Sequence, residues 1–414
     1  MLAAHHDQAA GVSQLKPKLE LADLFRLYAS AYRSSHRLPL THLKVMRAIE
    51  NCRTAALGGH IEQCNHCGYQ RQSYNSCRNR HCPKCQSLCK ARWLEDRKSD
   101  LLPVGYFHMV FTLPHELNPL ALSNKKVLCD LLFKAVSETL LEFGRKNLGG
   151  KIGLIAVLHT WDQTLLDHFH LHCLIPAGAL SMDRSRWILA RDNFLFSVRA
   201  LSVVYRGKMI DLLGQAFNKA RLKFVGRCEG LSDGDHFKRL LERLREKKWI
   251  VYAKKPFSSP KRVLDYLGRY THRVAISNNR IISIEDGEVS FSYRDRKTEN
   301  KLRRMTLLAE EFIRRFLLHV LPDSFVRIRH YGLLANRSKK ETLARCRWLL
   351  GEEGQPPAVV KKTSKELMLE VGGVDLSVCP ECKEGRMIKI GDLPSELAKP
   401  VKTVGSQRPK MDSS

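Results

Sequence analysis

Apolar residues recur three and four positions apart between residues 21 and 52. This spacing places them on one face of a helix, which can then pack against a core. Pro39 interrupts the pattern, and a proline breaks the interior of a helix. We therefore predict two helices in this region, one on each side of Pro39.

From residue 106 onward, the pattern changes to short segments rich in β-branched and aromatic residues, which are typical of strands. Four strands are predicted, at residues 106–113, 152–159, 170–175 and 249–253, together with a hairpin that pairs 280–284 with 289–293. Helical periodicity predicts helices at residues 127–143, 197–224 and 307–318, and a further one that begins near Pro260. This order predicts an α+β fold, an antiparallel sheet flanked by helices.

Periodicity fades after residue 350, where Gly, Pro, Lys and Ser become frequent. We expect a basic, flexible tail with one small ordered island there. The predicted units are a helical segment (1–50), a small zinc-ribbon domain (51–100), the sheet domain (101–350) and the tail (351–414).

The charge of the chain indicates its partner. Its 414 residues include 70 Lys and Arg against 42 Asp and Glu, which gives a formal charge of +28. Such an excess repels itself unless a polyanion binds, so nucleic acid is the expected partner.

No apolar run reaches the roughly 18 residues that would span a bilayer. The N-terminus has His5, His6 and Asp7 where a secretory signal would begin, so we expect an intracellular protein without a membrane partner.

Seven of the 13 cysteines lie between Cys52 and Cys89. Cys64 and Cys67 form one CxxC knuckle, and Cys82 and Cys85 form a second one 14 residues later, a spacing typical of a structural zinc ribbon. We predict that these four thiolates bind one zinc ion. The sequence leaves a second ion or another ligand set open, and the remaining candidates are Cys77, His81, Cys89 and His66. Cys379 and Cys382 form only a half-site, with Cys346 as a doubtful third ligand, and we assign no metal there.

Two basic groups could bind phosphates of a nucleic acid. Beside the knuckles these residues are Arg71, Arg78, Arg80 and Lys84, and near Pro260 they are Lys261, Arg262, Arg269 and Arg273. The alternative interpretation is an ordinary solvated basic surface.

His168, His170 and His172 alternate with apolar residues, and alternate side chains of a strand share one face. Neighbouring imidazoles would lie about 6.5 to 7 Å apart along that face, close enough to hold one cation. A hard ion such as Mg²⁺ or Mn²⁺ would leave positions free for phosphate oxygens. A histidine-rich edge strand and a zinc site are the alternatives.

Tyr266 and Tyr270 lie four residues apart in the helix that is predicted to begin near Pro260. This spacing points both phenols in one direction. The alternative is an ordinary buried stripe that also includes Val263 and Leu267.

Together these motifs resemble the insertion-sequence-91 family of transposases. The resemblance is carried by YNSCRNRHCPKCQ (74–86), HFHLHCLIP (168–176), YLGRYTHRVAISNNRI (266–281) and RHYGLLANR (329–337), in that order. It implies that His170 and His172 form the HUH metal motif and that Tyr266 and Tyr270 are the nucleophiles. The third ligand stays open among four residues, namely His168, Gln163, Asp162 and His159. Phe169 stands where many relatives have Pro, and we expect this change to be tolerated because residue 169 faces away from the metal.

The resemblance further implies a rolling-circle transposase of the bacterial cytoplasm that cuts single-stranded ends of a mobile element. Cleavage would pass through a 5′-phosphotyrosine, with Mg²⁺ or Mn²⁺ in the catalytic site and Zn²⁺ in a structural one. Three rival classes stay open, which are a zinc-ribbon DNA-binding protein without catalytic activity, a transposase that uses three carboxylates, and a zinc hydrolase.

Overall fold

The computed structural model describes residues 19–191, 193–257, 262–263, 268, 274–295, 298–352, 362–373 and 375–397. Most of the helix predicted near Pro260 lies outside these residues. The same holds for five of the predicted site residues, namely Tyr266, Tyr270, Lys261, Arg269 and Arg273.

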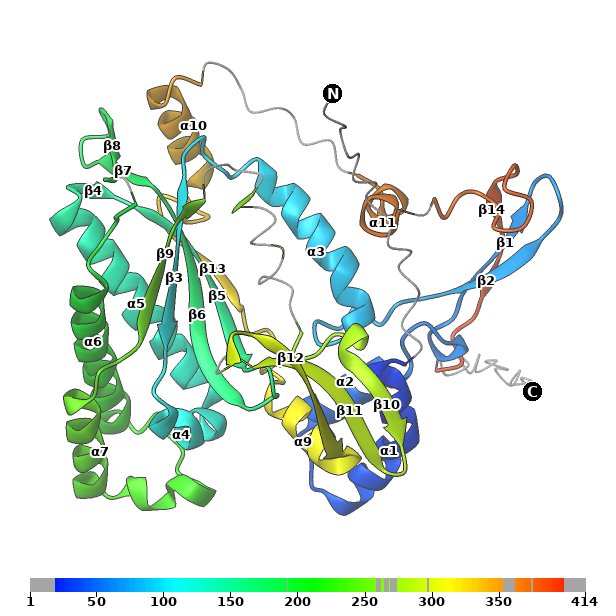
Figure 1. The fold of residues 1–414 in the computed structure, drawn as a ribbon, viewed down its shortest axis with the longest axis horizontal. Helices are drawn as coiled ribbons and strands as arrows, with labels where there is room; N and C mark the ends of the chain where they lie inside the picture. Colours follow the sequence, from blue (N-terminus) through cyan, green and yellow to red (C-terminus); the bar gives the residue numbers. More distant parts are fainter. Residues whose placement is uncertain are drawn as a thin grey trace, which may run out of the picture.

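A five-stranded sheet forms the centre of the molecule, and each neighbouring pair of its strands is antiparallel. In spatial order, its strands are β13 (Ile328–Gly332), β5 (Gly153–Trp161), β6 (Asp167–Pro176), β3 (Tyr106–Thr112) and β9 (Val251–Phe257) (Figure 1). Four of them coincide with predicted strands, and only β13 was not expected. The predicted α+β class with an antiparallel sheet is confirmed.

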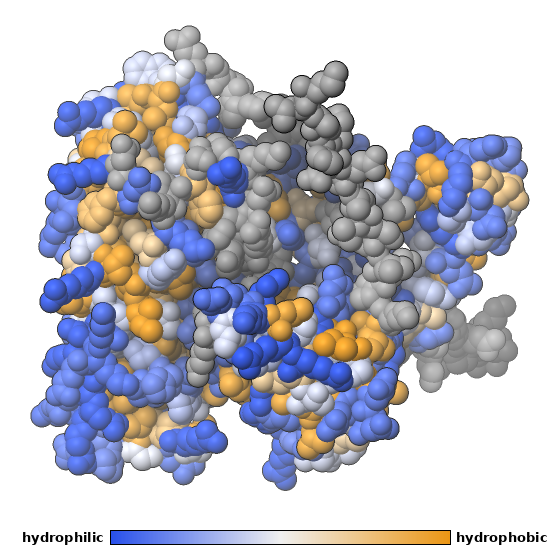
Figure 2. All heavy atoms as spheres, in the orientation of Figure 1, coloured by the Kyte–Doolittle hydropathy of each residue, from blue (hydrophilic) through white to orange (hydrophobic). Residues whose placement is uncertain are grey.

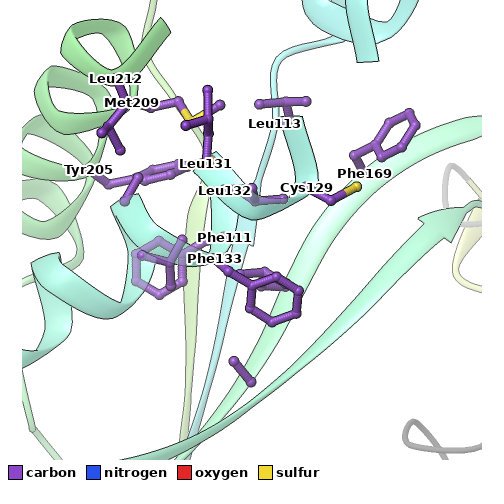
Figure 3. Close-up of a cluster of buried hydrophobic side chains, with 14 of the residues drawn as sticks. Phe111, Leu113, Cys129, Leu131, Leu132, Phe133, Phe169, Tyr205, Met209 and Leu212 are labelled. Carbon is purple, nitrogen blue, oxygen red and sulfur yellow. The ribbon is translucent and has the colours of Figure 1, made fainter. Parts of the chain in front are cut away.

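Helices cover one face of this sheet (Figure 1). They are α4 (Asn118–Ser123), α5 (Lys125–Asn147), α6 (Val198–Asn218) and α7 (Gly234–Glu246). Phe111 of β3 packs edge-to-face against Tyr205 of α6, Phe169 of β6 lies beside Cys129 of α5, and all four residues are buried (Figure 3). This layer is the largest apolar core in the described part of the chain, and it makes the sheet a rigid platform.

The opposite face of the sheet is divided into two parts. One part is apolar, where Ile155, Val157 and Leu174 pack with Val263 and with side chains that follow β13. The other part carries the histidines of β5 and β6. The alternation of side chains along each strand therefore separates the main core from a polar surface.

A second core joins the N-terminal helices to a later part of the chain. Helices α1 (Leu21–Ser35) and α2 (Leu40–Glu50) occur where they were predicted, on either side of Pro39. They pack with α9 (Ala309–Leu318) and with a sheet of β10 (Ile281–Glu285), β11 (Glu288–Asp295) and β12 (Lys301–Leu308). The β10–β11 hairpin was predicted. Helices α1 and α2 therefore share a core with elements far along the chain. The domain boundary predicted at residue 50 stays a prediction.

The cysteine-rich region forms β1 (Gly59–Cys64), β2 (Gln70–Tyr74) and α3 (Pro83–Lys98). Strand β1 also pairs with β14 (Met387–Leu393), so a segment of the predicted flexible tail is an ordered strand of a three-stranded sheet. This sheet extends away from the rest of the molecule (Figure 1). The described residues 375–397 are thus an ordered segment within the region after residue 350, and the predicted extent of the flexible tail stays a prediction.

The remaining elements are peripheral. They are β4 (Gly150–Lys151), β7 (Gly178–Ser181), β8 (Trp187–Leu189), α10 (Lys339–Leu349), α11 (Ser364–Gly372) and four short 3₁₀ turns. None of the helices in the described ranges has both the length and the apolar composition required to cross a bilayer. The face shown in Figure 2 is mainly hydrophilic, with apolar side chains in small groups, as expected for a highly charged chain.

Candidate metal centres and catalytic site

Three histidines converge on the open face of the central sheet. His159 lies on β5 directly opposite His170 of β6, and His172 lies two residues further along β6. One ring nitrogen from each of the three lies within 4.8 Å of the others. The Nε2 atoms of His170 and His172 are 3.1 Å apart.

The outer ring nitrogens of the two β6 histidines are held by neighbours. His170 donates its Nδ1–H to the carbonyl oxygen of His168 at 2.8 Å, which makes Nε2 the unprotonated nitrogen of its neutral ring. Nδ1 of His172 lies 2.9 Å from Nε2 of His108, a buried residue of β3. Burial, and the nearby charge of Lys254, lower the pKa of His108 to about 3, so its ring is neutral and can accept this hydrogen bond.

This arrangement fits a bound cation. Two lone pairs that face each other across 3.1 Å repel unless something positive lies between them. Two ligands at right angles around a metal, each about 2.1 Å from it, are about 3.0 Å apart, which is close to the observed separation. The three imidazoles could therefore hold one divalent ion.

The group identifies His159, rather than His168, as the third imidazole. His159 lies directly opposite His170, and one of its ring nitrogens joins those of His170 and His172. The His168 ring also lies near His170, with centroids 4.6 Å apart, but His168 is not a member of the converging group, and its carbonyl oxygen orients His170 instead. Of the other open candidates, Asp162 accepts hydrogen bonds within the β5–β6 turn and does not join the group, and Gln163 stays an open candidate.

A buried cluster of four cysteines lies at the start of α3. It consists of Cys52, Cys77, Cys82 and Cys85, whose sulfurs lie within 4.8 Å of one another. The sulfur of Cys85 is 3.6 Å from that of Cys52 and 3.5 Å from that of Cys77. These separations exclude disulfides and approach the roughly 3.8 Å expected between the sulfurs of a tetrahedral zinc site.

This zinc cluster is part of the second core. Cys52, Cys82 and Cys85 belong to the same buried cluster as Trp161, the last residue of β5, and Leu165, which lies in the turn between the two histidine strands. Hydrogen bonds from Cys52, Cys77 and Cys82 hold the pKa of the Cys85 thiol far below its usual range, which favours the thiolate that binds zinc. A structural ion here would anchor α3 beside the histidine site.

The prediction that Cys64, Cys67, Cys82 and Cys85 bind one ion was wrong. Cys64 lies at the far end of β1, about 20 Å of extended chain from its start. It groups with Cys67, Cys379 and Cys382 in a second cluster, whereas Cys82 and Cys85 group with Cys52 and Cys77. The prediction of Cys77 as an additional ligand agrees with this grouping. His81, Cys89, His66 and Cys346 belong to neither cluster.

Sequence analysis missed Cys52 and His108, and it recognised the C-terminal knuckle, Cys379 and Cys382, only as a half-site without a metal. Cys52 carries no motif, since it is a lone cysteine after a helix. The C-terminal knuckle had a usable signal, because both Cys67 and Cys382 are followed closely by a glycine, Gly68 and Gly385 respectively. No pattern in one sequence could have identified His108.

Several predicted DNA-binding residues make contacts within the protein. Arg71 is paired with Glu62 at 2.7 Å, and Lys84 is paired with Glu20 at 2.5 Å. Arg80 donates hydrogen bonds to the carbonyl oxygens of Pro322 and Phe325. Only Arg78 and Arg262 of the predicted set are exposed among the described residues.

Two residues beside the predicted tyrosines are described. Val263 is completely buried in the apolar part of the histidine face, with Ile155 and Val157. A Cβ atom at Gly268 would come within 2.9 Å of the side chains of Lys90 and Leu94 on α3. The described ends of this segment therefore contact the central sheet and the zinc-anchored helix.

Comparisons with known proteins agree on one family. Residues 153–342 match the family model described as "Putative transposase", and residues 24–113 match the model described as "Transposase zinc-binding domain" of the insertion-sequence-91 type. The chain is 48% identical to "Putative transposase y4qJ" of Sinorhizobium fredii over 90% of its own length and 94% of the relative. It is 29% identical to "Transposase for insertion sequence element IS801" of Pseudomonas savastanoi pv. phaseolicola, over 69% of this chain and 68% of the relative.

A solved structure, "Conjugative Relaxase TrwC in complex with mutant OriT Dna", aligns with 39% of this chain and 70% of its own. The sequence identity is 14% and the TM-score is 0.22. A similarity at this level carries no argument about function.

Proposed function

The chain belongs to the insertion-sequence-91 family of transposases, and from this premise we propose that it cleaves and rejoins single-stranded DNA through a tyrosine nucleophile. His159, His170 and His172 would hold a divalent cation, whose chemistry would assist the reaction. The substrate is the single-stranded end of a mobile element, and the reaction takes place in the bacterial cytoplasm.

The observation that carries this proposal is the shared face of the central sheet. Val157 lies directly opposite His172, and Val157 and Val263 belong to the same buried apolar cluster. Val263 precedes Tyr266 by three residues, less than one helical turn. The proposal therefore brings at least one of the two tyrosines over the same face as the three imidazoles.

A free tyrosine has a pKa near 10, so its hydroxyl is a weak nucleophile at neutral pH. The three imidazoles would hold an ion whose chemistry is to polarise a scissile phosphate and to stabilise the charge that develops on it. Nitrogen donors favour Mn²⁺ over Mg²⁺, because Mg²⁺ prefers oxygen ligands. Fixed hydrogen bonds to His170 and His172 keep their Nε2 atoms directed at one point.

The tyrosine oxygen attacks the phosphorus, and the bond to the 3′ oxygen of the preceding nucleotide breaks. The products are a 5′-phosphotyrosyl protein and a free 3′-hydroxyl, which takes up the proton. The covalent bond stores the energy of the broken linkage, so a 3′-hydroxyl can later attack and restore a phosphodiester. Tyr266 and Tyr270 would allow two strand ends to be held in turn.

A direct test mixes the purified protein with labelled single-stranded oligonucleotides from the ends of the element, in the presence of Mn²⁺. We expect a protein–DNA complex that survives denaturation and that is absent when Tyr266→Phe and Tyr270→Phe are combined. The matched control is Tyr69→Phe, which changes an exposed tyrosine between β1 and β2 rather than one on the central sheet, and it should leave the complex intact.

The rival classes give different results. A protein that only binds DNA would retain the oligonucleotide in native gels and yield no denaturation-resistant complex with any variant. A transposase that uses three carboxylates would cut without forming an adduct. Adduct formation that persists in the double Phe variant would refute the assignment of the nucleophiles.

A further inference from the structure

We propose that Cys64, Cys67, Cys379 and Cys382, called here the C-terminal zinc cluster, bind a second structural zinc ion. This ion would hold the C-terminal segment against the β1–β2 hairpin. The site is assembled from cysteines more than 300 residues apart, and half of it lies outside the residues 24–113 that match the zinc-binding family model. This inference is independent of the tyrosine chemistry proposed above.

The sulfur positions fit a tetrahedral zinc ion. All four sulfurs lie within 4.8 Å of one another. The separation is 3.7 Å between Cys64 and Cys382, and also 3.7 Å between Cys67 and Cys379. A zinc–sulfur distance of about 2.3 Å requires sulfurs about 3.8 Å apart, and a disulfide would require about 2.05 Å. Four thiolates would leave no open position, so the role of this site is structural.

The two knuckles have the same backbone form, which favours a common ligand. The residue after the second cysteine of each knuckle has a positive φ, +73° at Gly68 and +62° at Lys383. Each knuckle is closed by a hydrogen bond between residues four apart, from Gly68 to Cys64 and from Lys383 to Cys379. A left-handed Lys383 is strained relative to glycine, so the surrounding structure must hold this turn in place.

Backbone N–H groups point at the sulfurs. His66 and Cys67 direct theirs at Cys64 Sγ at 3.4 and 3.5 Å, and Gly385 directs its own at Cys382 Sγ at 3.3 Å. Such donors stabilise negative sulfur, as is required of zinc thiolates. Gly385 is also needed for space, because a Cβ atom there would lie 2.3 Å from Cys64 Sγ.

Strand pairing also attaches the C-terminal segment to β1, beyond the C-terminal zinc cluster. Strand β14 pairs along the whole of β1, from Cys64 opposite Met387 to Gly59 opposite Leu393. Arg386 and Asn65 exchange two further hydrogen bonds at 2.8 and 3.1 Å. This three-stranded sheet has only a small apolar cluster, which consists of Cys64, Cys379, Met387 and Cys382. So few apolar residues cannot stabilise a sheet alone, and metal binding would supply the missing free energy.

The two zinc sites differ in exposure. Cys67 is exposed in the C-terminal zinc cluster, whereas Cys52, Cys82 and Cys85 are buried in the other cluster. A chelator should therefore remove zinc from the C-terminal zinc cluster before it removes zinc from the buried cluster. Loss of the first zinc would release β14 while the buried zinc still anchors α3.

The test is the zinc content of the full-length protein, measured by native mass spectrometry. Changing His170→Ala and His172→Ala first prevents zinc in the histidine site from being counted. In this background we expect two zinc ions per chain, one for each cysteine cluster. Adding Cys379→Ser and Cys382→Ser should reduce the content to one. The control Cys89→Ser, which changes a cysteine outside both clusters, should keep two.

Hydrogen exchange provides a second readout for the case in which substitution disturbs folding. Limited chelation of the His170→Ala/His172→Ala protein, with all cysteines intact, should release one zinc quickly and raise exchange at residues 387–393, while α3 stays protected. The proposal is overturned if the Cys379→Ser/Cys382→Ser protein still holds two zinc ions. It is equally overturned if the first zinc released by chelation leaves exchange at residues 387–393 unchanged.

Discussion

Nε2 of His108 lies 2.9 Å from Nδ1 of His172, and the two rings are stacked nearly parallel. His108 is therefore a positioning residue, because it fixes the tautomer and the orientation of a ligand without joining the metal group itself. It belongs to β3, so the site depends on three neighbouring strands of the central sheet rather than on the two that carry the ligands.

Replacement of His108 by Leu should weaken Mn²⁺ binding by about 10- to 100-fold, the usual effect of removing an outer hydrogen-bond partner. His108→Gln should restore part of the affinity, since its amide oxygen can accept from Nδ1 of His172. Isothermal titration calorimetry with Mn²⁺ measures both values. Equal affinity in the Leu and Gln variants would show that His108 only fills space.

The third ligand can be tested with a matched pair of histidines. His159→Ala should abolish specific Mn²⁺ binding, because it removes one of the three converging nitrogens. His168→Ala should bind Mn²⁺ within a few-fold of the unsubstituted protein, because the carbonyl oxygen that orients His170 remains. Electron paramagnetic resonance of bound Mn²⁺ distinguishes the two. The reverse ranking would restore His168 as the ligand.

The features that sequence predicted best are local. Alternation along His168–His172 predicted which side chains share a face, and the predicted strand 170–175 lies within β6, which begins three residues earlier and ends one residue later. The third imidazole depended on register between β5 and β6, which places His159 opposite His170. Pairing partners were not visible in either strand alone, so the choice between His159 and His168 could not be made from spacing.

The zinc ligands were harder still to predict from sequence, because their grouping also depends on which strands pair. Two CxxC knuckles 14 residues apart suggested one tetrahedron, because nearby cysteines were assumed to be nearest in space. Strand β1 instead carries Cys64 away from Cys82, and β14 brings Cys379 to it. A contact between residues more than 300 positions apart leaves no local trace in the chain.

Gly332 holds β13 beside β5, and its replacement tests how the sheet is closed. Its φ is +64°, and a Cβ atom there would lie within 2 Å of the carbonyl oxygen of Ile152, so Ala cannot fit without moving a strand. Gly332→Ala should lower the thermal unfolding temperature by several degrees or prevent folding.

Gly287 provides the control, because its φ is +79° but nothing lies within 4 Å of the position that a Cβ atom would occupy. Gly287→Ala should cost only the backbone strain of a left-handed Ala, about 1 kcal/mol. Differential scanning calorimetry compares the two variants. A similar loss in both would mean that contact with Ile152 is unimportant.

His319 should make the fold sensitive to acid. Its Nε2–H donates to the carbonyl oxygen of Leu165 at 3.0 Å, and its Nδ1 accepts from the hydroxyl of Thr160 at 3.3 Å, so the neutral ring is fully satisfied. Burial lowers its pKa from 6.5 to about 4, and the charges of Lys125 and Asp162 act in opposite directions on it. A proton would add a buried charge and remove the acceptor.

The unfolded chain binds a proton at His319 as the pH falls below 6.5, whereas the folded chain resists it until about pH 4. Stability is therefore complete above pH 6.5 and falls by up to roughly 3 kcal/mol between pH 6.5 and 4. His319→Gln removes this titration but keeps an amide donor for Leu165. Its unfolding temperature should decline less steeply over that interval than that of the unsubstituted protein, and parallel pH profiles would show that His319 is not the group responsible.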